Sequence, residues 1–405
     1  MFTRYFNVIT LFACFYLVAP SYGQKPQKVA AEHFKNQNFQ AAFPVYERLL
    51  QTDSLNTEYA VNAAKCLLNT NSDKTKVIPI LKRLDKHGKA TGESQFLLAK
   101  AYTFEYNFDM SSMILQKHQS IIPEDLKEEA NRMLKNNSSA KILMQNPVNV
   151  SFENLGPKIN SEYADYYPYV TANENALIFT SRRKKSGAVK EFDGYYNSDI
   201  YQVMNFDAEY PRVKNLGTSV NTNFDEQVVG LSRDGIEMMV YIDHVEEYGD
   251  IYLSHKSSSK YAPIQKLGVN VNSEELETSA SFSNDRNTLF FASRREGGYG
   301  GLDLYMSRKL PDGTWGKSQN LGPDVNTDGD EDFPFLAQDD KLFFSSNGHP
   351  GMGGSDLNVT VWDPELNKWG KVLNLGFPIN TPDNNRTISF NNDGSHAYVS
   401  MYRND

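Results

Sequence analysis

The chain has 405 residues, enough for two domains that each bury a core of their own. Hydrophobic residues make up 40% and charged residues 22%, which is typical of globular proteins and excludes a disordered or fibrous chain. The formal net charge is −9 at pH 7. We expect no nucleic-acid binding, because non-specific binding needs a basic surface that displaces counterions.

Residues 1–23 have the features of a signal peptide. Arg4 supplies the positive charge, and the mostly apolar stretch Tyr5–Ala19 follows it. Ser21 and Gly23 are small residues at the positions that precede a cleavage site. A membrane-spanning helix needs ~20 apolar residues, more than this stretch contains, so we expect export and no transmembrane helix in the mature chain.

The sequence contains two cysteines, Cys14 inside the apolar stretch and Cys66 in a helical segment. The mature chain therefore has no disulfide to form, which is compatible with a bacterial periplasm. The run Leu11–Cys14 is similar to a lipoprotein acylation site, but Phe12 is bulky where such sites carry a small residue. We predict a periplasmic protein without a lipid anchor, and lipidation at Cys14 is the alternative.

Residues 25–146 follow a helical pattern. Ala42, Tyr46 and Leu49 fall on one helix face, at the spacing i, i+4, i+7. Small residues recur in the same phase with periods of 33 and 36 residues, at Ala30, Ala63 and Ala99. The pattern resembles tetratricopeptide repeats, in which a small residue lets paired helices approach closely. A last helix over about 124–145 is expected to cover the open end of the stack.

Residues 147–405 contain five copies of one strand-rich repeat. Each copy has an Asn-Leu-Gly segment, with Lys in place of Asn in the third, and an asparagine four residues after the glycine. The leucines are 61, 51, 54 and 54 residues apart, and this length holds the four strands of one propeller blade. The glycines are Gly156, Gly217, Gly268, Gly322 and Gly376, and the asparagines are Asn160, Asn221, Asn272, Asn326 and Asn380.

The strands inside each repeat are also predictable. Turns rich in Asn, Asp and Gly precede an apolar second strand, and an aspartate begins the third strand of the first four copies. The second strands are expected over 176–181, 237–242, 288–293, 341–346 and 395–400. The third strands are expected to begin at Asp199, Asp250, Asp303 and Asp356.

These strand motifs resemble the WD40-like PD40 repeat of TolB-type propellers. An export signal, tetratricopeptide-like helices and PD40 repeats together are similar to the front part of PorE-like OmpA-family proteins of the type IX secretion system in Bacteroidota. The resemblance implies a non-enzymatic, periplasmic, outer-membrane-associated scaffold for envelope or secretion-system proteins. The carboxypeptidase-regulatory-like and OmpA-like domains of those relatives are not found in this sequence, so the resemblance implies no anchoring to the cell wall.

We therefore expect an α + β multidomain protein, with TPR-like helical repeats over 25–146 and an all-β propeller over 147–405. The five repeats predict five blades. The fifth repeat ends after its second strand, which predicts an incomplete last blade and an imperfect closing seam. The segment Asn149–Leu155 is expected to supply an outer strand to that blade.

Four carboxylates recur five residues after the repeat asparagine, and Asn385 takes this place in the last copy. A ring of them around the channel could bind a cation or a basic partner; alternatively, each caps a turn or pairs with a neighbouring blade. The carboxylates are Asp165, Glu226, Glu277 and Glu331. The run 328–332 lacks the downstream glutamate of a calcium loop, so no metal is predicted.

Four arginines follow the second strands of the first and third copies. They could bind an acidic partner or an anionic glycan; alternatively, they are solvated loop tips or pair with the recurrent carboxylates. These arginines are Arg182, Arg183, Arg294 and Arg295.

The sequence shows no Gly-x-Ser-x-Gly elbow and no His-Glu-x-x-His zinc motif, and its seven histidines are scattered. We therefore expect neither catalysis nor a cofactor. A second hypothesis is a peptidoglycan- or glycan-binding module that uses Tyr195, Tyr196 and Tyr299 as stacking platforms. A propeller hydrolase is the remote third.

Overall fold

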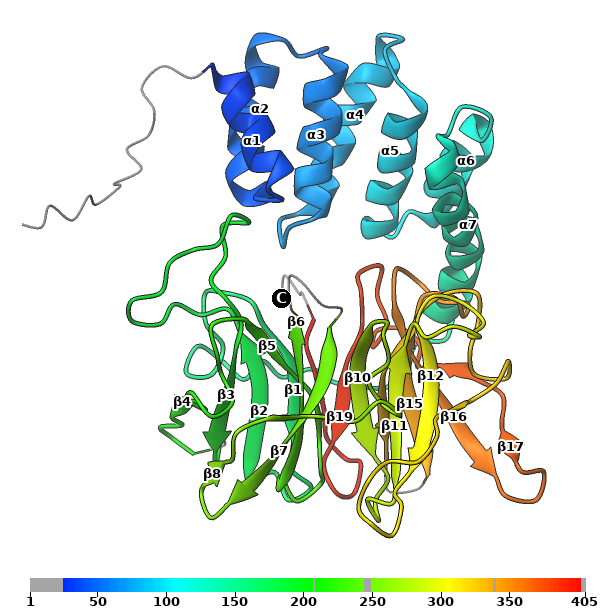
Figure 1. The fold of residues 1–405 in the computed structure, drawn as a ribbon. Coiled ribbons are helices and arrows are strands. Elements are labelled where there is room, and N and C mark those ends of the chain that lie inside the picture. The colour runs from blue at the N-terminus through cyan, green and yellow to red at the C-terminus, as the bar shows by residue number, and fades with distance from the viewer. Residues whose placement is uncertain (1–24, 207, 244–248, 338–339, 402–405) are drawn as a thin grey trace, which may run out of the picture.

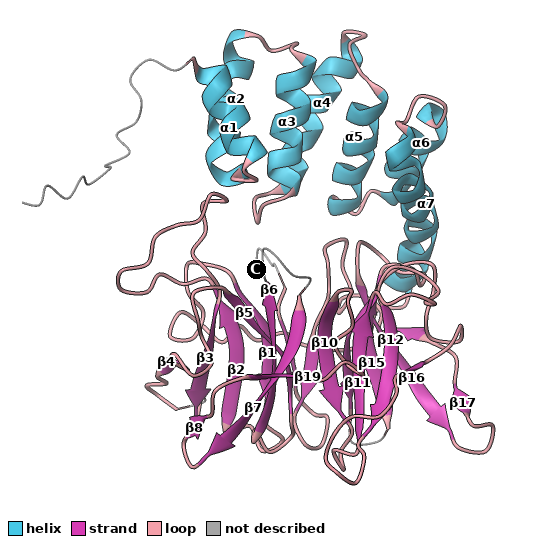
Figure 2. Ribbon diagram, viewed as in Figure 1, coloured by secondary structure: helices cyan, strands magenta, loops and turns pink. Residues whose placement is uncertain are grey.

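The computed structural model describes residues 25–206, 208–243, 249–337 and 340–401. Helices come first in the chain and antiparallel sheets follow (Figures 1 and 2). In Figure 1 the helices lie over one end of the strands, and α7 descends to the sheets. The predicted signal peptide and Cys14 lie outside the described residues.

The described residues form seven α-helices and a 3-10 turn before the first strand. The elements are α1 Pro26–Lys35, α2 Phe39–Thr52, α3 Thr57–Leu68, η1 Lys74–Lys76, α4 Val77–Lys86, α5 Gly92–Phe104, α6 Phe108–His118 and α7 Glu124–Gln145. Asparagine side chains cap α2, α3 and α6 by accepting a backbone N–H of the first turn, which fixes where each helix begins. The last helix spans the residues that the sequence predicted.

The small residues of the helical repeat occupy equivalent buried positions. Ala30, Ala63 and Ala99 lie in α1, α3 and α5, the first helix of each successive pair, and all three are 0% exposed. A larger side chain at these positions would separate the packed helices. The core between the helices is apolar and includes Tyr46, Leu67 and Phe96.

In the described part of the chain twenty strands follow, in four sheets of four or five strands and one sheet of two. The first sheet contains β1 Asp165–Val170, β2 Ala176–Ser181, β3 Asp199–Met204 and β4 Val213–Asn215; the second contains β5 Asp225–Leu231, β6 Glu237–Asp243, β7 Asp250–Ser257, β8 Lys260–Tyr261 and β9 Gln265–Lys266. The third contains β10 Glu277–Phe282, β11 Thr288–Ser293, β12 Asp303–Arg308 and β13 Gln319–Asn320. The fourth contains β14 Glu331–Leu336, β15 Lys341–Ser346, β16 Asp356–Asp363, β17 Lys368–Trp369 and β18 Leu373–Asn374, and the last contains β19 Ile388–Phe390 and β20 Ala397–Val399.

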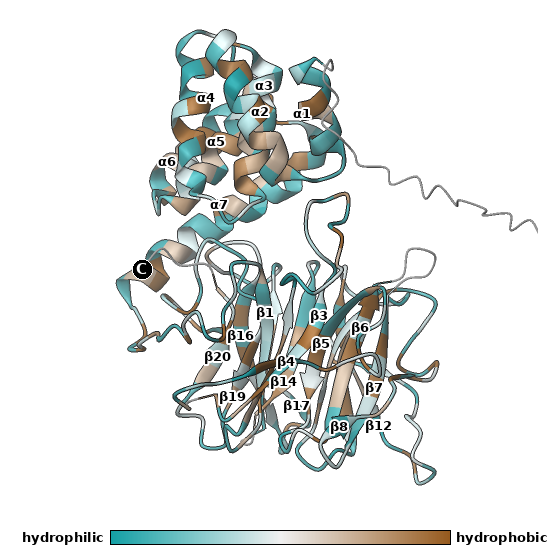
Figure 3. Ribbon diagram, turned by 90° about the vertical axis from the view of Figure 1, so that its left-hand side faces the viewer, coloured by the Kyte–Doolittle hydropathy of each residue, from teal (hydrophilic) through white to brown (hydrophobic). Residues whose placement is uncertain are grey.

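The strand predictions are confirmed for the first four repeats. The strands β2, β11 and β15 span the predicted residues, and β6 extends one residue further. The third strands β3, β7, β12 and β16 begin at the predicted aspartates. Apolar residues lie along strands such as β6 and β7, and hydrophilic residues are frequent in the loops (Figure 3).

The sheets are arranged like the blades of a propeller. The first strands β1, β5, β10 and β14 contact one another in sequence, and β19 contacts β1. The ring of Phe390 in β19 also packs on Phe335 and Phe343 of the fourth sheet, with ring centroids 5.9 and 4.7 Å apart. Ser389 Oγ accepts a hydrogen bond from the Val170 backbone N–H in β1 at 3.3 Å. The two-stranded sheet therefore joins the fourth sheet to the first.

The prediction of five blades is corrected. The structure has four blades, and the described part of the fifth repeat forms only the two-stranded sheet β19–β20. The expected outer strand over Asn149–Leu155 is also absent from the described residues, which form a loop there. In the four blades the segment before the repeat glycine pairs with a third strand, and the described residues place no third strand beside Asn149–Leu155.

The repeat asparagine fastens the third strand to the linker between blades. Its Oδ1 accepts from the backbone N–H of one residue in that strand, and its Nδ2 donates to the carbonyl of the same residue, at 2.8–3.0 Å. The pairs are Asn221 with Ile200, Asn272 with Ile251, Asn326 with Leu304 and Asn380 with Leu357. All eight residues are at most 5% exposed, so these bonds satisfy buried backbone groups.

We predict that Asn326→Ala destabilises the fold far more than Asn160→Ala. The first change leaves the buried N–H of Leu304 without a partner, at a cost of roughly 1–3 kcal/mol, and removes one of the two donors to its carbonyl, which keeps the Leu321 N–H at 3.0 Å. Asn160 binds no strand in the described residues, and its side chain donates only to Asn154, so its loss should cost about 1 kcal/mol or less. Urea unfolding of both variants measures the difference, and equal destabilisation would contradict this role of the asparagine.

Candidate functional site

The glycine-rich loop 351–354 attaches the propeller to the last helix. Asn136 of α7 donates to the Gly353 carbonyl at 2.8 Å and accepts from the Gly351 N–H at 3.2 Å. Met352 is 1% exposed and packs with Phe108 and other residues of the helical domain. The loop therefore serves as a docking turn.

Two further contacts fix the helices to the propeller. Lys74, the first residue of η1, forms an ion pair with Asp383 in the loop before β19. Its ammonium group also lies 4.3 Å from the ring centre of Phe104, a favourable cation–π position. Tyr106 packs edge-on against Phe377, at 6.0 Å between ring centres. The helices and the propeller thus share a joint made of apolar, ionic and hydrogen-bonded contacts.

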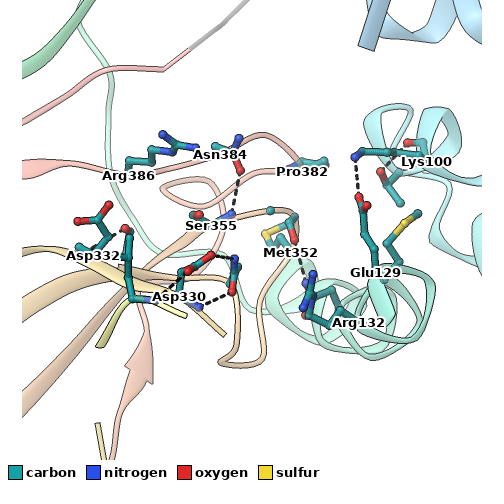
Figure 4. Close-up of a pocket in the computed structure, with 18 of the residues that line it drawn as sticks. Lys100, Glu129, Arg132, Asp330, Asp332, Met352, Ser355, Pro382, Asn384 and Arg386 are labelled. Carbon is teal, nitrogen blue, oxygen red and sulfur yellow. Dashed lines mark hydrogen bonds and ion pairs between the residues drawn. The ribbon is translucent and has the colours of Figure 1, made fainter. Parts of the chain in front are cut away.

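A cavity of about 430 Å³ lies in this joint, between α5 and α7 on one side and the loops of the third and fourth blades on the other (Figure 4). Charged side chains of both signs line it: Lys100, Glu129, Arg132, Arg294, Asp330, Asp332 and Arg386. On the helical side Lys100 pairs with Glu129 at 2.6 Å, and Arg132 pairs with Glu128 at 2.6 Å. The cavity is therefore suited to a polar or charged ligand.

Asp332 is the most constrained acid of the cavity. Its Oδ1 accepts hydrogen bonds from Thr278 Oγ1 at 2.6 Å and from Ser279 Oγ at 2.5 Å, both in the neighbouring blade. Burial raises the pKa of this carboxyl, while the Ser279 and Thr278 hydroxyls and the nearby Arg386 act in the opposite direction. The carboxylate therefore ties β10 to β14 on the floor of the cavity.

Two aromatic residues take an unusual backbone conformation near Asp332. Tyr167 in β1 and Phe333 in β14 have φ values of +54° and +50°, in the left-handed region that these residues rarely adopt. A bulge at each place aims the two rings at each other, with centroids 4.5 Å apart. Burial raises the pKa of the Tyr167 hydroxyl, and the nearby Arg386 acts in the opposite direction. The pair connects the first, fourth and fifth repeats.

Sequence reasoning missed this aromatic pair. A signal was present, because Tyr167 and Phe333 both lie two residues after the recurrent acid and directly before a proline, Pro168 or Pro334. Only the first and fourth repeats have this aromatic–proline pair, so it does not stand out as a repeat position, unlike the asparagine and the acid that recur in four or five copies.

The four recurrent carboxylates are placed apart, each in its own turn. Each accepts from the hydroxyl of a Ser or Thr four residues earlier: Ser161 for Asp165, Thr222 for Glu226, Ser273 for Glu277 and Thr327 for Glu331. The three glutamates are 0% exposed. The described residues contain no cluster of three His, Cys, Asp or Glu side chains suited to a metal. Partner binding by these acids stays a prediction, and the observed contacts are those of turn caps.

Three of the four predicted arginines are engaged by their own blades. Arg183 pairs with Asp165 at 2.8 Å and lies over the rings of Phe179 and Tyr201. In the third blade Arg295 repeats this arrangement with Glu277, Phe291 and Tyr305, and Arg182 pairs with Asp193 at 2.8 Å. The fourth, Arg294, is 51% exposed and lines the cavity, 3.7 Å from Asp330. The structure thus brings only Arg294 of the four to the cavity.

The three tyrosines proposed for glycan stacking do not share a surface. Tyr196 is 8% exposed and packs on Tyr163, and Tyr195 lies under the Arg182 guanidinium group. Tyr299 is 50% exposed. A stacking platform would therefore depend on Tyr299.

Neither a scan of protein-family models nor a search of curated proteins finds a match for this chain. Among solved structures it is similar to TolB from Acinetobacter baumannii, with 16% identity and a TM-score of 0.40 over 59% of this chain and 49% of that one. It is also similar to a putative TolB from Agrobacterium tumefaciens (18%, TM-score 0.37, 59% and 90%) and to the periplasmic gluconolactonase PpgL of Pseudomonas aeruginosa (14%, TM-score 0.36, 58% and 77%). The match thus spans about half of the first of these proteins, and none of the three similarities carries an argument about function.

Within the described part of the chain, no helix is both long and apolar enough to cross a membrane.

We predict a pH-dependent stability to which Glu331 contributes, together with Glu226 and Asp356, whose pKa values burial also raises to about 7. In Glu331 burial raises the pKa from 4.5 to about 7, although the Ser346 and Thr327 side chains and the Thr327 N–H lower it. A carboxyl whose pKa is higher in the folded protein than in the unfolded chain stabilises the fold at pH values below its ordinary pKa of 4.5. This stabilisation is lost as the pH rises from 4.5 to about 7. Glu331→Gln cannot ionise, so the fall in unfolding free energy between pH 5 and 7.5 should shrink by about 2 kcal/mol.

Asn385 fills the same place in the fifth repeat and accepts from the Thr381 N–H at 2.8 Å, so an amide is compatible with the turn. Denaturant unfolding at both pH values measures the effect, with the exposed Glu191→Gln as control. If the free energy of unfolding fell as much between the two pH values in Glu331→Gln as in the wild type, this carboxyl would not contribute to the pH dependence.

Proposed function

We propose that this chain is a non-enzymatic periplasmic scaffold that binds a protein partner of the cell envelope at the cavity between the helices and the propeller. The observation that carries the proposal is the cavity itself. Two folds that commonly serve interaction contribute charged side chains to it, and their joint holds those side chains in fixed positions.

The charges favour a polypeptide segment as the ligand. Arg294 and Arg386 face the cavity from the propeller, and Lys100 faces it from α5. Asp330 and Asp332 lie among them, so a segment with side chains of both signs finds complementary partners. The export signal and the PD40-like repeats support a periplasmic, outer-membrane-associated location, and their resemblance to PorE-like proteins supports partners from the type IX secretion machinery.

The glycan-binding hypothesis is weaker, because only Tyr299 of the three tyrosines is largely exposed. Retention on purified sacculi distinguishes the two hypotheses: the scaffold should not bind them, and specific retention lost in Tyr299→Ala would favour the glycan module.

We predict site-specific crosslinking at the cavity. A photo-crosslinking residue at position 294 should capture one or two envelope proteins, because this side chain is half exposed at the rim. The matched control is position 308, an exposed arginine at the other end of the same blade. Mass spectrometry of both samples identifies the captured proteins, and identical patterns at the two positions would refute the cavity as the binding site.

A further inference from the structure

We propose that one proton on the buried carboxyl of Asp356 holds the helical domain on the propeller, and that loss of this proton releases the docking turn 351–354 from α7. The attachment of the two domains is then controlled by pH. The inference concerns the joint itself and does not depend on which ligand the cavity binds, so it goes beyond the function proposed above.

The docking turn closes directly over the Asp356 carboxyl. Its Oδ2 accepts the Met352 N–H at 2.9 Å and the Gly353 N–H at 3.3 Å. A Cβ atom on Gly351 would lie 1.9 Å from the same oxygen, so the turn approaches as closely as glycine allows. Asn136 of α7 binds both Gly351 and Gly353 from the other side. A movement of the turn at Asp356 therefore acts directly on the contact between the domains.

The second oxygen of this carboxyl has no partner. Asp356 is 1% exposed, and its Oδ1 accepts no hydrogen bond from a described residue. Asn358 Oδ1, two residues further along the same face of β16, is also buried and without a donor. The Asn358 side chain already reaches residue 356, because its Nδ2 donates to the Asp356 carbonyl at 2.8 Å. A proton on Asp356 Oδ1 supplies the donor that these two buried acceptors lack.

The fourth blade differs here from the other three blades, in which the residue before the repeat Leu-Gly donates to the third-strand aspartate. The pairs are Asn215 with Asp199 at 2.9 Å, Lys266 with Asp250 at 2.6 Å and Asn320 with Asp303 at 2.8 Å. In the fourth blade this residue is Asn374, and its Nδ2 donates to the Pro350 carbonyl at 3.3 Å instead. Among the four described third-strand aspartates, Asp356 alone lacks this side-chain donor.

Charged groups on the neighbouring elements do not compensate an ionised Asp356. These groups are Glu331 on β14, His349 between β15 and β16, Arg132 on α7, and Asp383 and Arg386 before β19. Ser346 lies opposite Asp356 in β15 and donates to Glu331 at 2.6 Å, which places a second acid on that side. Burial lowers the pKa of His349, so this imidazole is neutral near pH 7. Within the described residues no ion pair joins Asp356 to any of them.

Burial raises the pKa of the Asp356 carboxyl from 3.8 to about 7, although the Met352 and Gly353 N–H groups lower it. Between these pH values the docked state keeps the proton, and a carboxyl exposed to water by a released turn loses it. Docking is therefore tightest at acidic pH, weakens as the pH rises through this range, and changes little above pH 7. An ionised Asp356 gains a partner when the turn opens to water or when Asn374 leaves the Pro350 carbonyl to bind it, and both movements displace the turn.

The test is hydrogen exchange, read by mass spectrometry, of the chain from residue 24 onward between pH 5 and 8, with the intrinsic pH dependence of amide exchange divided out. We expect the protection of residues 351–354 to fall roughly tenfold per pH unit between pH 5 and 6.5 and to level off near pH 7. The equivalent turn of the third blade is the internal control. Its Tyr299 and Gly300 N–H groups donate to Asp303, which Asn320 also binds, so its protection should stay constant.

Asp356→Asn is the variant that separates the proton from the fold. Its amide can accept from the turn with Oδ1 and donate to Asn358 with Nδ2, as the protonated acid does. The turn should therefore stay protected at every pH in this variant. Glu331→Gln is the matched control at the neighbouring acid and should leave the pH dependence of the turn in place.

Constant protection of the turn in the wild type, a pH dependence that survives in Asp356→Asn, or one that disappears in Glu331→Gln would each overturn the proposal. Circular dichroism checks that both variants are folded, and the comparison of the two turns within the wild type needs no variant. Since no ligand takes part, the result is independent of the crosslinking at position 294.

Discussion

The side chain of the repeat asparagine joins the linker between two blades to the third strand of the blade before it. A linker between blades has no strand-to-strand hydrogen bonds of its own, yet it has to connect two blades at a fixed angle. The asparagine solves this by satisfying both backbone groups of one buried third-strand residue, as Asn326 does for Leu304. A single amide supplies both a donor and an acceptor, a combination that neither a carboxylate nor a lysine offers. The same turn positions the recurrent acid five residues later.

The side chains that differ between repeats lie outside these asparagine bonds. The acids of the second, third and fourth blades are capped by hydroxyls of their own turns, and Arg183 and Arg295 cover aromatic rings in two blades. The surface that we propose for recognition lies where the repeats differ. One such place is the cavity under α5 and α7, near the strained Tyr167 and Phe333.

Much of the local structure was predictable from the sequence. The third strands begin at the expected aspartates, and α7 spans the expected residues, because hydrophobic period and turn chemistry are local properties. The number of blades could not be predicted in this way, because a repeat forms a blade only when its strands pair into a sheet of four or more. The segment Asn149–Leu155 has the sequence of an outer strand and remains a loop. The cavity could not be predicted either, because it depends on how Asn136 and Met352 dock two domains.

The bonds of the repeat asparagines fix each of the four blades in the ring. Hydrogen exchange of the backbone amides of Ile200, Ile251, Leu304 and Leu357, each of which donates to a repeat asparagine, tests this most directly. We expect these four amides to exchange only through global unfolding of the propeller and to be among its slowest-exchanging amides. Exchange at the rate of the loop amides around 149–155 would contradict it.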